Sequence, residues 1–248
     1  MKGLIAIISL FIIAFGVTEN AIKNNTTDYD STYSETLIDC GADIGDSFEE
    51  DPTVEYTTED DTAVEDGDWA LILVNKDNPV PEGYEVKLTR LSNGTSVDSR
   101  IYPALQAMFN DARANGLGLF VREGYRTYGD QQRIMTERIH SYIDQGYSKE
   151  EADALAREYV AIPGTSEHQL GICVDINADT SISSDDAVYQ WLYDNAYKYG
   201  FIKRYTGDKS DITGISDEPW HYRYVGRKAA LKIHESGLCL EEYVDQIN

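Results

Sequence analysis

Cysteine, histidine and basic residues are scarce in this sequence. The small number of cysteines argues against a disulfide scaffold, and the small number of basic residues argues against a nucleic acid-binding protein. The 248 residues include three cysteines, an odd number that leaves at least one thiol unpaired and argues against a disulfide scaffold. Lys and Arg number 21 against 44 Asp and Glu, which gives a formal net charge of −23. Because this charge repels phosphates and no basic stripe offsets it, we expect no nucleic acid partner.

Several short motifs are also absent. No segment repeats along the chain, and the H-E-x-x-H motif of many zinc peptidases does not occur. No Leu-x-x-Cys pattern lies directly after the apolar N-terminal run, which argues against a lipoprotein. A metal site in this chain therefore has to be sought in other patterns.

The first residues, MKGLIAIISLFIIAFGV, contain one lysine and an uninterrupted apolar run from Gly3 to Val17. A helix of about 15 residues spans about 22 Å, less than the roughly 30 Å hydrocarbon core of a bilayer. This length suits a secretory signal, with Ala14-Phe15-Gly16 as the cleavage site, or an uncleaved membrane anchor. Both predict export, to the outer face of the cell membrane or into the cell wall, with membrane contact only through residues 1–17.

Most of the negative charge lies in one segment. Residues 18–68 carry 17 acidic side chains and one lysine, a net charge of −16. Lys2 adds one positive charge, so residues 69–248 carry −8 of the total of −23. Low apolar content with charge of one sign cannot offset the entropy lost on ordering. We therefore predict a disordered linker over residues 18–66 and a single folded domain over residues 67–248.

The folded part mixes helical and strand patterns. Helices are predicted over residues 98–116, 128–146, 148–161 and 184–200, with one or two more after Gly226. Strands are predicted over residues 117–126, 171–177 and 220–226. Because helices and strands do not alternate regularly, this order favours an α+β fold over a doubly wound one.

Two of the predicted helices carry start signals. Apolar residues recur at helical spacing after Asp98, which is a candidate N-cap, and they comprise Ile101, Leu105, Met108 and Ala112. Ser148 and Glu151 form the pattern of a capping box.

Two of the four histidines lie beside carboxylates in glycine-containing strand segments. His168 and Asp175 are seven residues apart, and a turn at Gly171 could return the carboxylate to the imidazole. His221, from a neighbouring strand, could supply a third ligand. Two imidazoles and one carboxylate with an open fourth position make a catalytic zinc site, and Glu218 could deprotonate water there. The alternative is that both histidines are structural, as we expect for His140 and His234.

Cys173 lies inside the same segment. Its even spacing from Asp175 predicts that both side chains face one side of the strand, which would bring a thiol close to the metal. The alternatives are an inert buried cysteine or a disulfide with Cys239.

The segments SEHQLGICVD and EPWHYRYVG resemble the two signatures of the VanY-like D-alanyl-D-alanine carboxypeptidases, Ser-x-His-x-x-Gly-x-Ala-x-Asp and Glu-x-Trp-His. The resemblance extends, in the family's order, to LVNKDNPVPEGY, GYRTYGDQQ and ITGISDEPWHYRYVG, and covers roughly residues 69–240. Cys173 departs from the signature, because it stands where the family has Ala. The resemblance implies one catalytic domain with a small antiparallel sheet flanked by helices, the D-Ala-D-Ala/hedgehog-type zinc peptidase fold.

The resemblance also implies a role for each matching residue. His168, Asp175 and His221 correspond to the ligands of Zn²⁺, and Glu218 corresponds to the general base. Arg126 matches an arginine that holds the substrate carbonyl and stabilises the oxyanion. The expected substrate contacts are Ser166, Gln131, Tyr125 and Trp220.

The expected function is removal of the terminal D-Ala from a peptidoglycan stem peptide by a zinc-dependent D,D-carboxypeptidase. An L,D-carboxypeptidase or a D,D-dipeptidase would have the same metal site and a different pocket. A non-catalytic wall-binding module would not need Glu218. The sequence predicts no oligomeric state.

Overall fold

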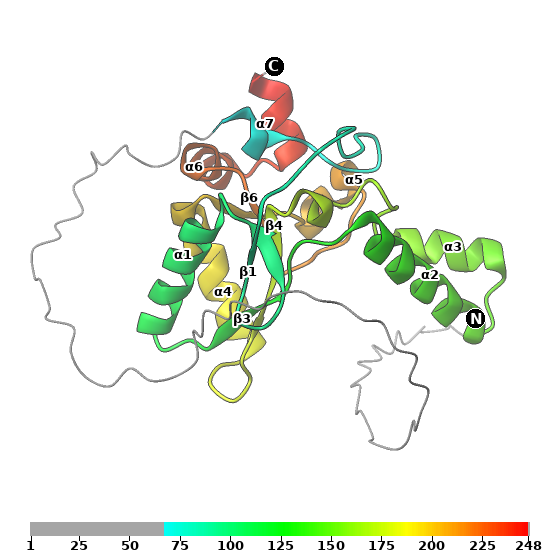
Figure 1. The fold of residues 1–248 in the computed structure, drawn as a ribbon, viewed down its shortest axis with the longest axis horizontal. Coiled ribbons are helices and arrows are strands. Elements are labelled where there is room, and N and C mark those ends of the chain that lie inside the picture. Colours follow the sequence, from blue (N-terminus) through cyan, green and yellow to red (C-terminus); the bar gives the residue numbers. More distant parts are fainter. Residues whose placement is uncertain (1–66, 248) are drawn as a thin grey trace, which may run out of the picture. The chain divides into compact units, whose positions relative to one another are not determined.

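The computed structural model describes residues 67–247, which form a domain around a four-stranded antiparallel sheet (Figure 1). The strand order is β3 (Leu119–Glu123), β4 (Cys173–Ala178), β6 (His221–Tyr224) and β5 (Phe201–Lys203). A separate two-stranded sheet pairs β1 (Leu88–Arg90) with β2 (Ser96–Asp98). The predicted α+β class is confirmed, whereas the predictions for residues 1–17 and 18–66 lie outside the described residues.

Helices flank the sheet, and the two helices α2 and α3 project to one side of it as an antiparallel pair (Figure 1). The α-helices are α1 (Tyr102–Ala114), α2 (Tyr128–Asp144), α3 (Lys149–Arg157), α4 (Asp185–Asn195), α5 (Ser210–Thr213), α6 (Arg227–Ser236) and α7 (Leu240–Ile247). Short 3-10 turns are η1 (Asp68–Leu71), η2 (Glu167–Leu170), η3 (Ala196–Tyr199) and η4 (Gly207–Lys209).

The apolar face predicted for α1 forms part of the main core. Its residues Ile101, Leu105, Met108 and Ala112 are at most 3% exposed and belong to one cluster with the inner residues of β3 and β4. The N-cap prediction was wrong, because Ile101 occupies that position. Asp98 instead ends β2, where its carboxylate accepts hydrogen bonds from the backbone and side chain of Arg100.

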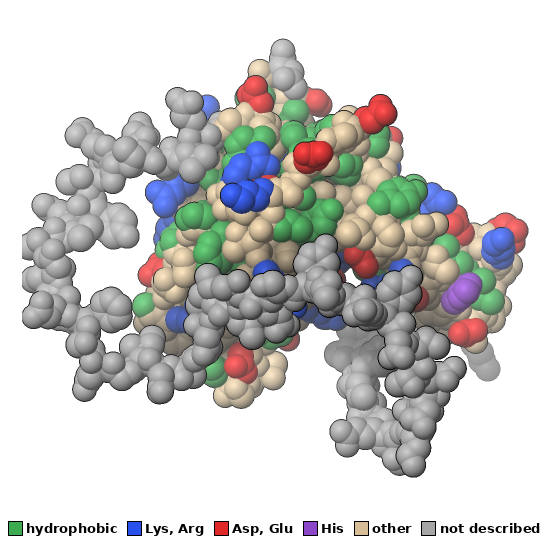
Figure 2. Space-filling model, in the orientation of Figure 1, with side chains coloured by type: hydrophobic (Ala, Val, Ile, Leu, Met, Phe, Trp, Pro, Cys, Tyr) green, Lys and Arg blue, Asp and Glu red, His purple; other side chains and the backbone are tan. Residues whose placement is uncertain are grey.

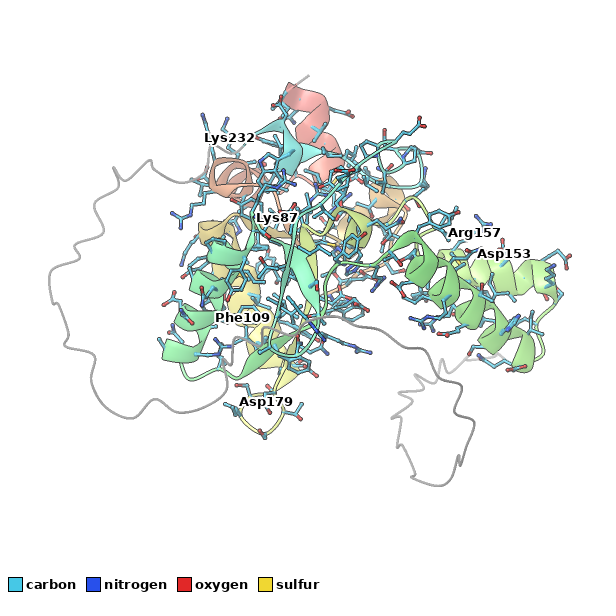
Figure 3. The ribbon with its side chains drawn as sticks, in the orientation of Figure 1. Lys87, Phe109, Asp153, Arg157, Asp179 and Lys232 are labelled. Atoms are coloured by element: carbon cyan, nitrogen blue, oxygen red, sulfur yellow. The ribbon has the colours of Figure 1, made fainter. Side chains whose placement is uncertain are left out.

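Capping boxes begin both α2 and α3. The hydroxyl of Thr127 accepts from the backbone of Asp130, and Ser148 pairs with Glu151 in the same way, as the sequence predicted. Asp153 and Arg157 on α3 form an exposed ion pair of 2.6 Å (Figure 3). An exposed pair of this kind contributes at most about 1 kcal/mol to stability. The helices therefore owe their starts to local signals in the sequence.

The surface is of mixed polarity. On the face seen in Figure 2, Lys and Arg side chains are separated by acidic, apolar and other side chains and do not merge into one basic stripe. Among residues 67–247, no helix has the length and apolarity to cross a bilayer.

Candidate active site

Two neighbouring strands bring one carboxylate and one imidazole together. The antiparallel register of β4 and β6 places Asp175 opposite His221, and Cys173 opposite Arg223. Because side chains two residues apart on a strand share a face, Cys173 and Asp175 point to the same side of β4. The register of the sheet therefore brings together two of the three predicted ligands, Asp175 and His221.

His168 reaches the same place through a tight turn. It lies in η2, which ends at Gly171 with φ of 73°, and the chain then enters β4. A Cβ at position 171 would lie 3.2 Å from a methyl carbon of Val86 and 3.3 Å from the backbone nitrogen of Asp98. Glycine is thus required there both by the backbone conformation and by the space available.

The three predicted ligands meet around one oxygen atom. Oδ1 of Asp175 lies 3.5 Å from Nε2 of His168 and 3.0 Å from Nδ1 of His221. The two imidazole rings are 5.0 Å apart between centroids and nearly perpendicular. Asp175 Oδ1 is buried, and none of its contacts has the geometry of a hydrogen bond. This oxygen is consequently available to a cation.

The other ring nitrogen of His168 is held by the backbone. Nδ1 lies 2.7 Å from the carbonyl oxygen of Gly124, which can only accept, so Nδ1 carries the proton. In the neutral ring the lone pair of His168 is therefore on Nε2, which faces Asp175. A hydrogen bond of this kind orients a metal-binding imidazole.

Glu218 lies next to His221 and is not one of the three predicted ligands. Its Oε2 is 3.7 Å from Nδ1 of His221, and its side chain is 17% exposed. The backbone nitrogen of Glu218 donates to the carbonyl of Tyr205, and its carbonyl accepts from the backbone of His221. Burial raises the pKa of the Glu218 carboxyl, His221 opposes that rise, and Asp175 adds to it. A partly buried carboxylate with a raised pKa is suited to exchange protons.

Arg126 is held near the second carboxylate oxygen of Asp175, Oδ2. Its Nη2 lies 3.6 Å from Oδ2 of Asp175, and its Nε lies 3.3 Å from a carboxylate oxygen of Glu123. Its Nη1 donates to Oε1 of Gln131 at 3.1 Å, and its backbone nitrogen donates to the carbonyl of His168. The guanidinium is thus oriented from three directions at the edge of the group formed by His168, Asp175 and His221.

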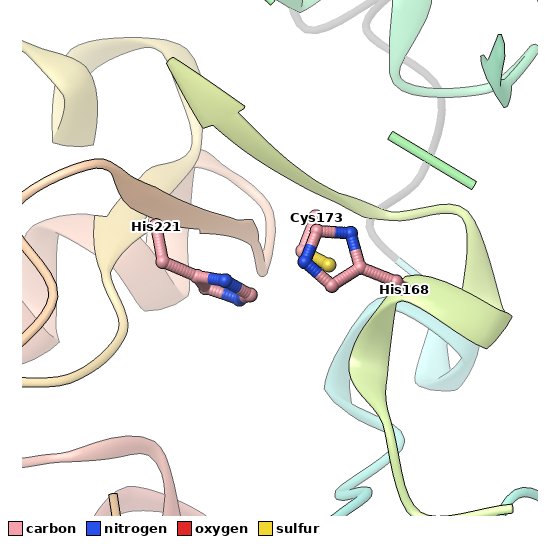
Figure 4. Close-up of side chains that lie close together, drawn as sticks. All are labelled: His168, Cys173 and His221. Atoms are coloured by element: carbon pink, nitrogen blue, oxygen red, sulfur yellow. The ribbon is translucent and has the colours of Figure 1, made fainter. Parts of the chain in front are cut away.

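Cys173 lies close to both histidines (Figure 4). Its sulfur and one nitrogen from each of His168 and His221 lie within 4.8 Å of one another, and all three residues are buried. Burial alone would raise the pKa of the Cys173 thiol, but the two imidazoles lower it to about 7. Cys173 and Cys239 are both free, so no disulfide joins them.

The buried residues also shift the titration of the histidines. Burial alone would lower the pKa of His168, but Cys173 and Asp175 raise it to about 9. The pKa of the Asp175 carboxyl is well below its usual range, because the two imidazoles outweigh the effect of burial. The Asp175 carboxylate therefore stays charged beside positively charged groups.

The sequence reasoning missed a buried acidic residue next to His168. Glu167 is fully buried, and its Oε1 accepts from Nε of Arg204 at 2.8 Å and from Nη1 of Arg223 at 2.7 Å. Its other oxygen, Oε2, lies 3.6 Å from Nε2 of His221. Glu167 stands inside the first signature segment, but nothing in the local pattern revealed these distant partners.

The expected substrate contacts are distributed over two cavities. Ser166, Gln131 and Trp220 line the cavity that also contains the histidines, Arg126 and Glu218. Ser166 and Gln131 are buried, whereas Trp220 is 36% exposed. Tyr125 does not line this cavity but an adjacent one, which shares Glu123 and Arg126 with it.

The remaining two histidines lie away from this cavity. His234 stacks on Tyr197 with ring centroids 3.8 Å apart, and His140 is exposed on α2. Neither belongs to the site.

A comparison with protein families matches residues 94–227 to the VanY model, described as D-alanyl-D-alanine carboxypeptidase. The chain is 55% identical over 187 residues to a D-alanyl-D-alanine carboxypeptidase of Enterococcus faecalis, an alignment that covers 74% of this chain and 70% of that protein. This chain belongs to the VanY family of D-alanyl-D-alanine carboxypeptidases. It is therefore an enzyme of the carboxypeptidase type, and the resemblance read from the two signatures is confirmed.

Solved structures of this family share the fold. The structure of VanYB in complex with D-alanine-D-alanine matches with a TM-score of 0.70 and 55% identity, over 71% of this chain and 98% of that chain. A mutant of a vancomycin resistance D,D-pentapeptidase VanY, in complex with Zn(II), matches with a TM-score of 0.69 and 56% identity, over 71% and 99% of the two chains. The D-Ala-D-Ala zinc peptidase fold expected from the sequence is thus confirmed.

Proposed function

We propose that this chain is an exported, zinc-dependent D,D-carboxypeptidase that removes the terminal D-Ala from peptidoglycan stem peptides. The observation that carries the proposal is the meeting of two imidazoles at one buried carboxylate oxygen, with Glu218 and Arg126 in contact with the same group. Family membership and the relatives that bind Zn(II) and D-alanine-D-alanine support it.

The residues present fit a zinc ion. Nε2 of His168, Oδ1 of Asp175 and Nδ1 of His221 are the donor atoms, because they face one another and the Asp175 oxygen has no hydrogen bond. We exclude Cys173 from the ligands although its sulfur is near, since a fourth protein ligand would close a site that catalysis requires to be open. When bound, zinc polarises the scissile carbonyl and lowers the pKa of water.

Glu218 transfers protons, and Arg126 stabilises the negative charge that develops during the reaction. Glu218 accepts the proton of the water molecule that attacks the scissile carbonyl and passes it to the amine of the leaving D-Ala. Its raised pKa favours both steps, because the carboxyl must be a base first and an acid afterwards. Arg126 holds the carbonyl oxygen and stabilises the negative charge that develops there.

The rest of the cavity supplies binding and orientation. Ser166 and Trp220 line it and are assigned to the substrate. Gln131 acts through Arg126, because its amide oxygen accepts from that guanidinium while its amide nitrogen donates to the carbonyl of Ala161. Tyr125 is assigned to the adjacent cavity, beside Arg126.

Export and membrane attachment belong to the same proposal. Residues 1–17 direct the chain out of the cell as a signal or hold it as an anchor, and the acidic residues 18–66 connect them to the catalytic domain. The enzyme then works at the outer face of the membrane or in the wall, where its substrate is. Fractionation of cells into membrane, wall and medium tests this part.

The activity is tested by mass spectrometry of a defined muropeptide pentapeptide after incubation with the zinc-loaded protein. Release of a single D-Ala supports the proposal. Cleavage of the tetrapeptide, or of free D-Ala-D-Ala, in preference to the pentapeptide would replace it with an L,D-carboxypeptidase or a dipeptidase. Binding of the peptide without any turnover would identify a wall-binding module.

A further inference from the structure

A second buried carboxylate faces the outer nitrogen of His221. Oε2 of Glu167 and Nε2 of His221 are 3.6 Å apart, and neither atom has a hydrogen bond among the described residues. This separation is longer than a formed hydrogen bond, but both atoms are buried. The Cys173 thiol also lies near the two rings, but a thiol is only a weak hydrogen-bond partner. A proton on Nε2 therefore has one strong acceptor within reach, which is Glu167.

Glu167 is held in place by two arginines that are distant from it in the sequence. Its Oε1 accepts from both Arg204 and Arg223, and Arg204 also makes two bonds of 2.8 and 2.6 Å to Glu241 on α7. Arg223 donates further to the carbonyls of Ala70 and Ile72. The side chains of Glu167, Arg204 and Arg223 are fully buried, so Glu167 cannot turn away from His221 without breaking charged hydrogen bonds.

The two histidines are consequently held through different nitrogens. His168 places Nδ1 on the Gly124 carbonyl and turns Nε2 to Asp175. His221 places Nε2 toward Glu167 and turns Nδ1 to Asp175. Each neutral ring thus presents a lone pair to a cation bound at the Asp175 oxygen only if its other nitrogen carries the proton.

We propose that Glu167 is a positioning residue that holds His221 in the Nε2-protonated tautomer, with His168 in the opposite, Nδ1-protonated tautomer. Glu167 thereby keeps the lone pair of His221 Nδ1 directed at the metal position that His221 shares with His168 and Asp175. This inference rests on the proposed function, because it assigns His221 to the zinc site.

A carboxylate can do this where an amide cannot. Glu167 accepts on Oε1 from two arginines and presents a second acceptor, Oε2, to His221. A glutamine at this position has one acceptor oxygen, which the arginines would take, and its NH₂ group would then face His221 Nε2. The imidazole would respond by moving its proton to Nδ1, which removes the lone pair from the metal side.

The experiment measures the tautomers directly and the zinc affinity of two matched variants. Long-range ¹H–¹⁵N NMR spectra of the metal-free chain, recorded at a pH where the rings are neutral, report which nitrogen of each of its four histidines carries a proton. Zinc affinity follows from competition with a chromophoric chelator, and the melting temperature of each metal-free protein reports its stability. The variants are Glu167→Gln and Glu241→Gln, since each removes one charge from Arg204 but only Glu167 faces His221.

We expect His221 to carry its proton on Nε2 and His168 on Nδ1 in the parent protein. Glu167→Gln should weaken zinc binding by about 10–100-fold, the range for residues that orient a metal ligand. Glu241→Gln should bind zinc like the parent, although both variants melt at lower temperature. A proton on Nδ1 of His221 in the parent, unchanged affinity in Glu167→Gln, or equal losses in both variants would overturn the proposal.

Two further points keep this test decisive. If Glu167→Gln does not fold, the tautomers of the parent protein still decide the question. Neither the tautomers nor the zinc affinity requires turnover, so a parent protein that binds zinc but releases no D-Ala would refute the proposed activity and leave this inference standing.

Discussion

Replacement of Glu218 by glutamine separates an enzyme from a binding module. The change keeps the size of the side chain and its hydrogen-bonding capacity, but it removes the basic carboxylate that lies 3.7 Å from His221 Nδ1. The three donor atoms of His168, Asp175 and His221 are untouched. Zinc and substrate should therefore still bind, while proton transfer should fail.

The size of the loss follows from the role assigned to the residue. A positioned general acid–base group contributes about 10²–10⁴-fold to the rate, which corresponds to about 2.7–5.4 kcal/mol of transition-state stabilisation. Because Glu218 serves both proton transfers and its side chain is only 17% exposed, bulk water cannot readily replace it. We expect kcat to fall by at least about 10²-fold. KM should change little, since the carboxylate is not assigned to substrate binding.

The assay is release of D-Ala from the muropeptide pentapeptide, with parent and variant at matched zinc content. Asp217→Asn is the matched control, because Asp217 is the neighbouring residue and makes an exposed ion pair of 2.7 Å with Lys203. That variant should turn over like the parent, since an exposed pair contributes at most about 1 kcal/mol to stability. A Glu218→Gln protein that releases D-Ala near the parent rate would move the general base elsewhere and refute the mechanism.

Four further predictions address the metal, the thiol, the linker and pH. His168→Ala should lose the near-stoichiometric zinc of the parent in metal analysis, and full retention would contradict the ligand assignment. Cys173→Ala should keep both zinc content and turnover, so a large loss of either would make the thiol a ligand. A chain without residues 18–66 should hydrolyse a soluble peptide like the parent, and much slower turnover by a folded product would disprove the linker role. The pKa of Glu241 is lowered despite burial by its bonds to Arg204, so its contribution to stability is complete above about pH 4.3 and is lost as pH falls through the lowered value. The melting temperature should therefore fall more steeply below pH 5 in the parent than in Glu241→Gln, and parallel curves would remove Glu241 from this role.

Local patterns in the sequence were sufficient for the longer helices, though not for the four-residue α5, and for the choice of candidate ligands. The spacing of Ile101, Leu105, Met108 and Ala112 predicted the buried face of α1, because a helix brings such positions to one side. The capping box at Ser148 and Glu151 is a contact between residues three apart, so a short segment contains all of it. The chemistry of His, Asp and Glu, read with the two signatures, was enough to select the candidate site residues.

Features that depend on distant partners were not predictable in this way. The strands β1, β2 and β5 have three residues each, too few for an alternating pattern to be recognised. Asp98 looked like an N-cap, but its carboxylate is engaged by Arg100 and its backbone nitrogen by the carbonyl of Gly171. A local signal was here overridden by contacts that form only in the folded chain.

By itself, therefore, the sequence determined which residue types carry the chemistry and where the helices α2 and α3 begin. Only the tertiary structure decided how these residues are oriented. The register of β4 against β6 sets Asp175 opposite His221, and the fold brings Arg204 and Arg223 to Glu167 across 37 and 56 residues. The physical reason is that hydrogen bonds between buried charges depend on distances in space, which neither the periodicity nor the composition of a segment encodes.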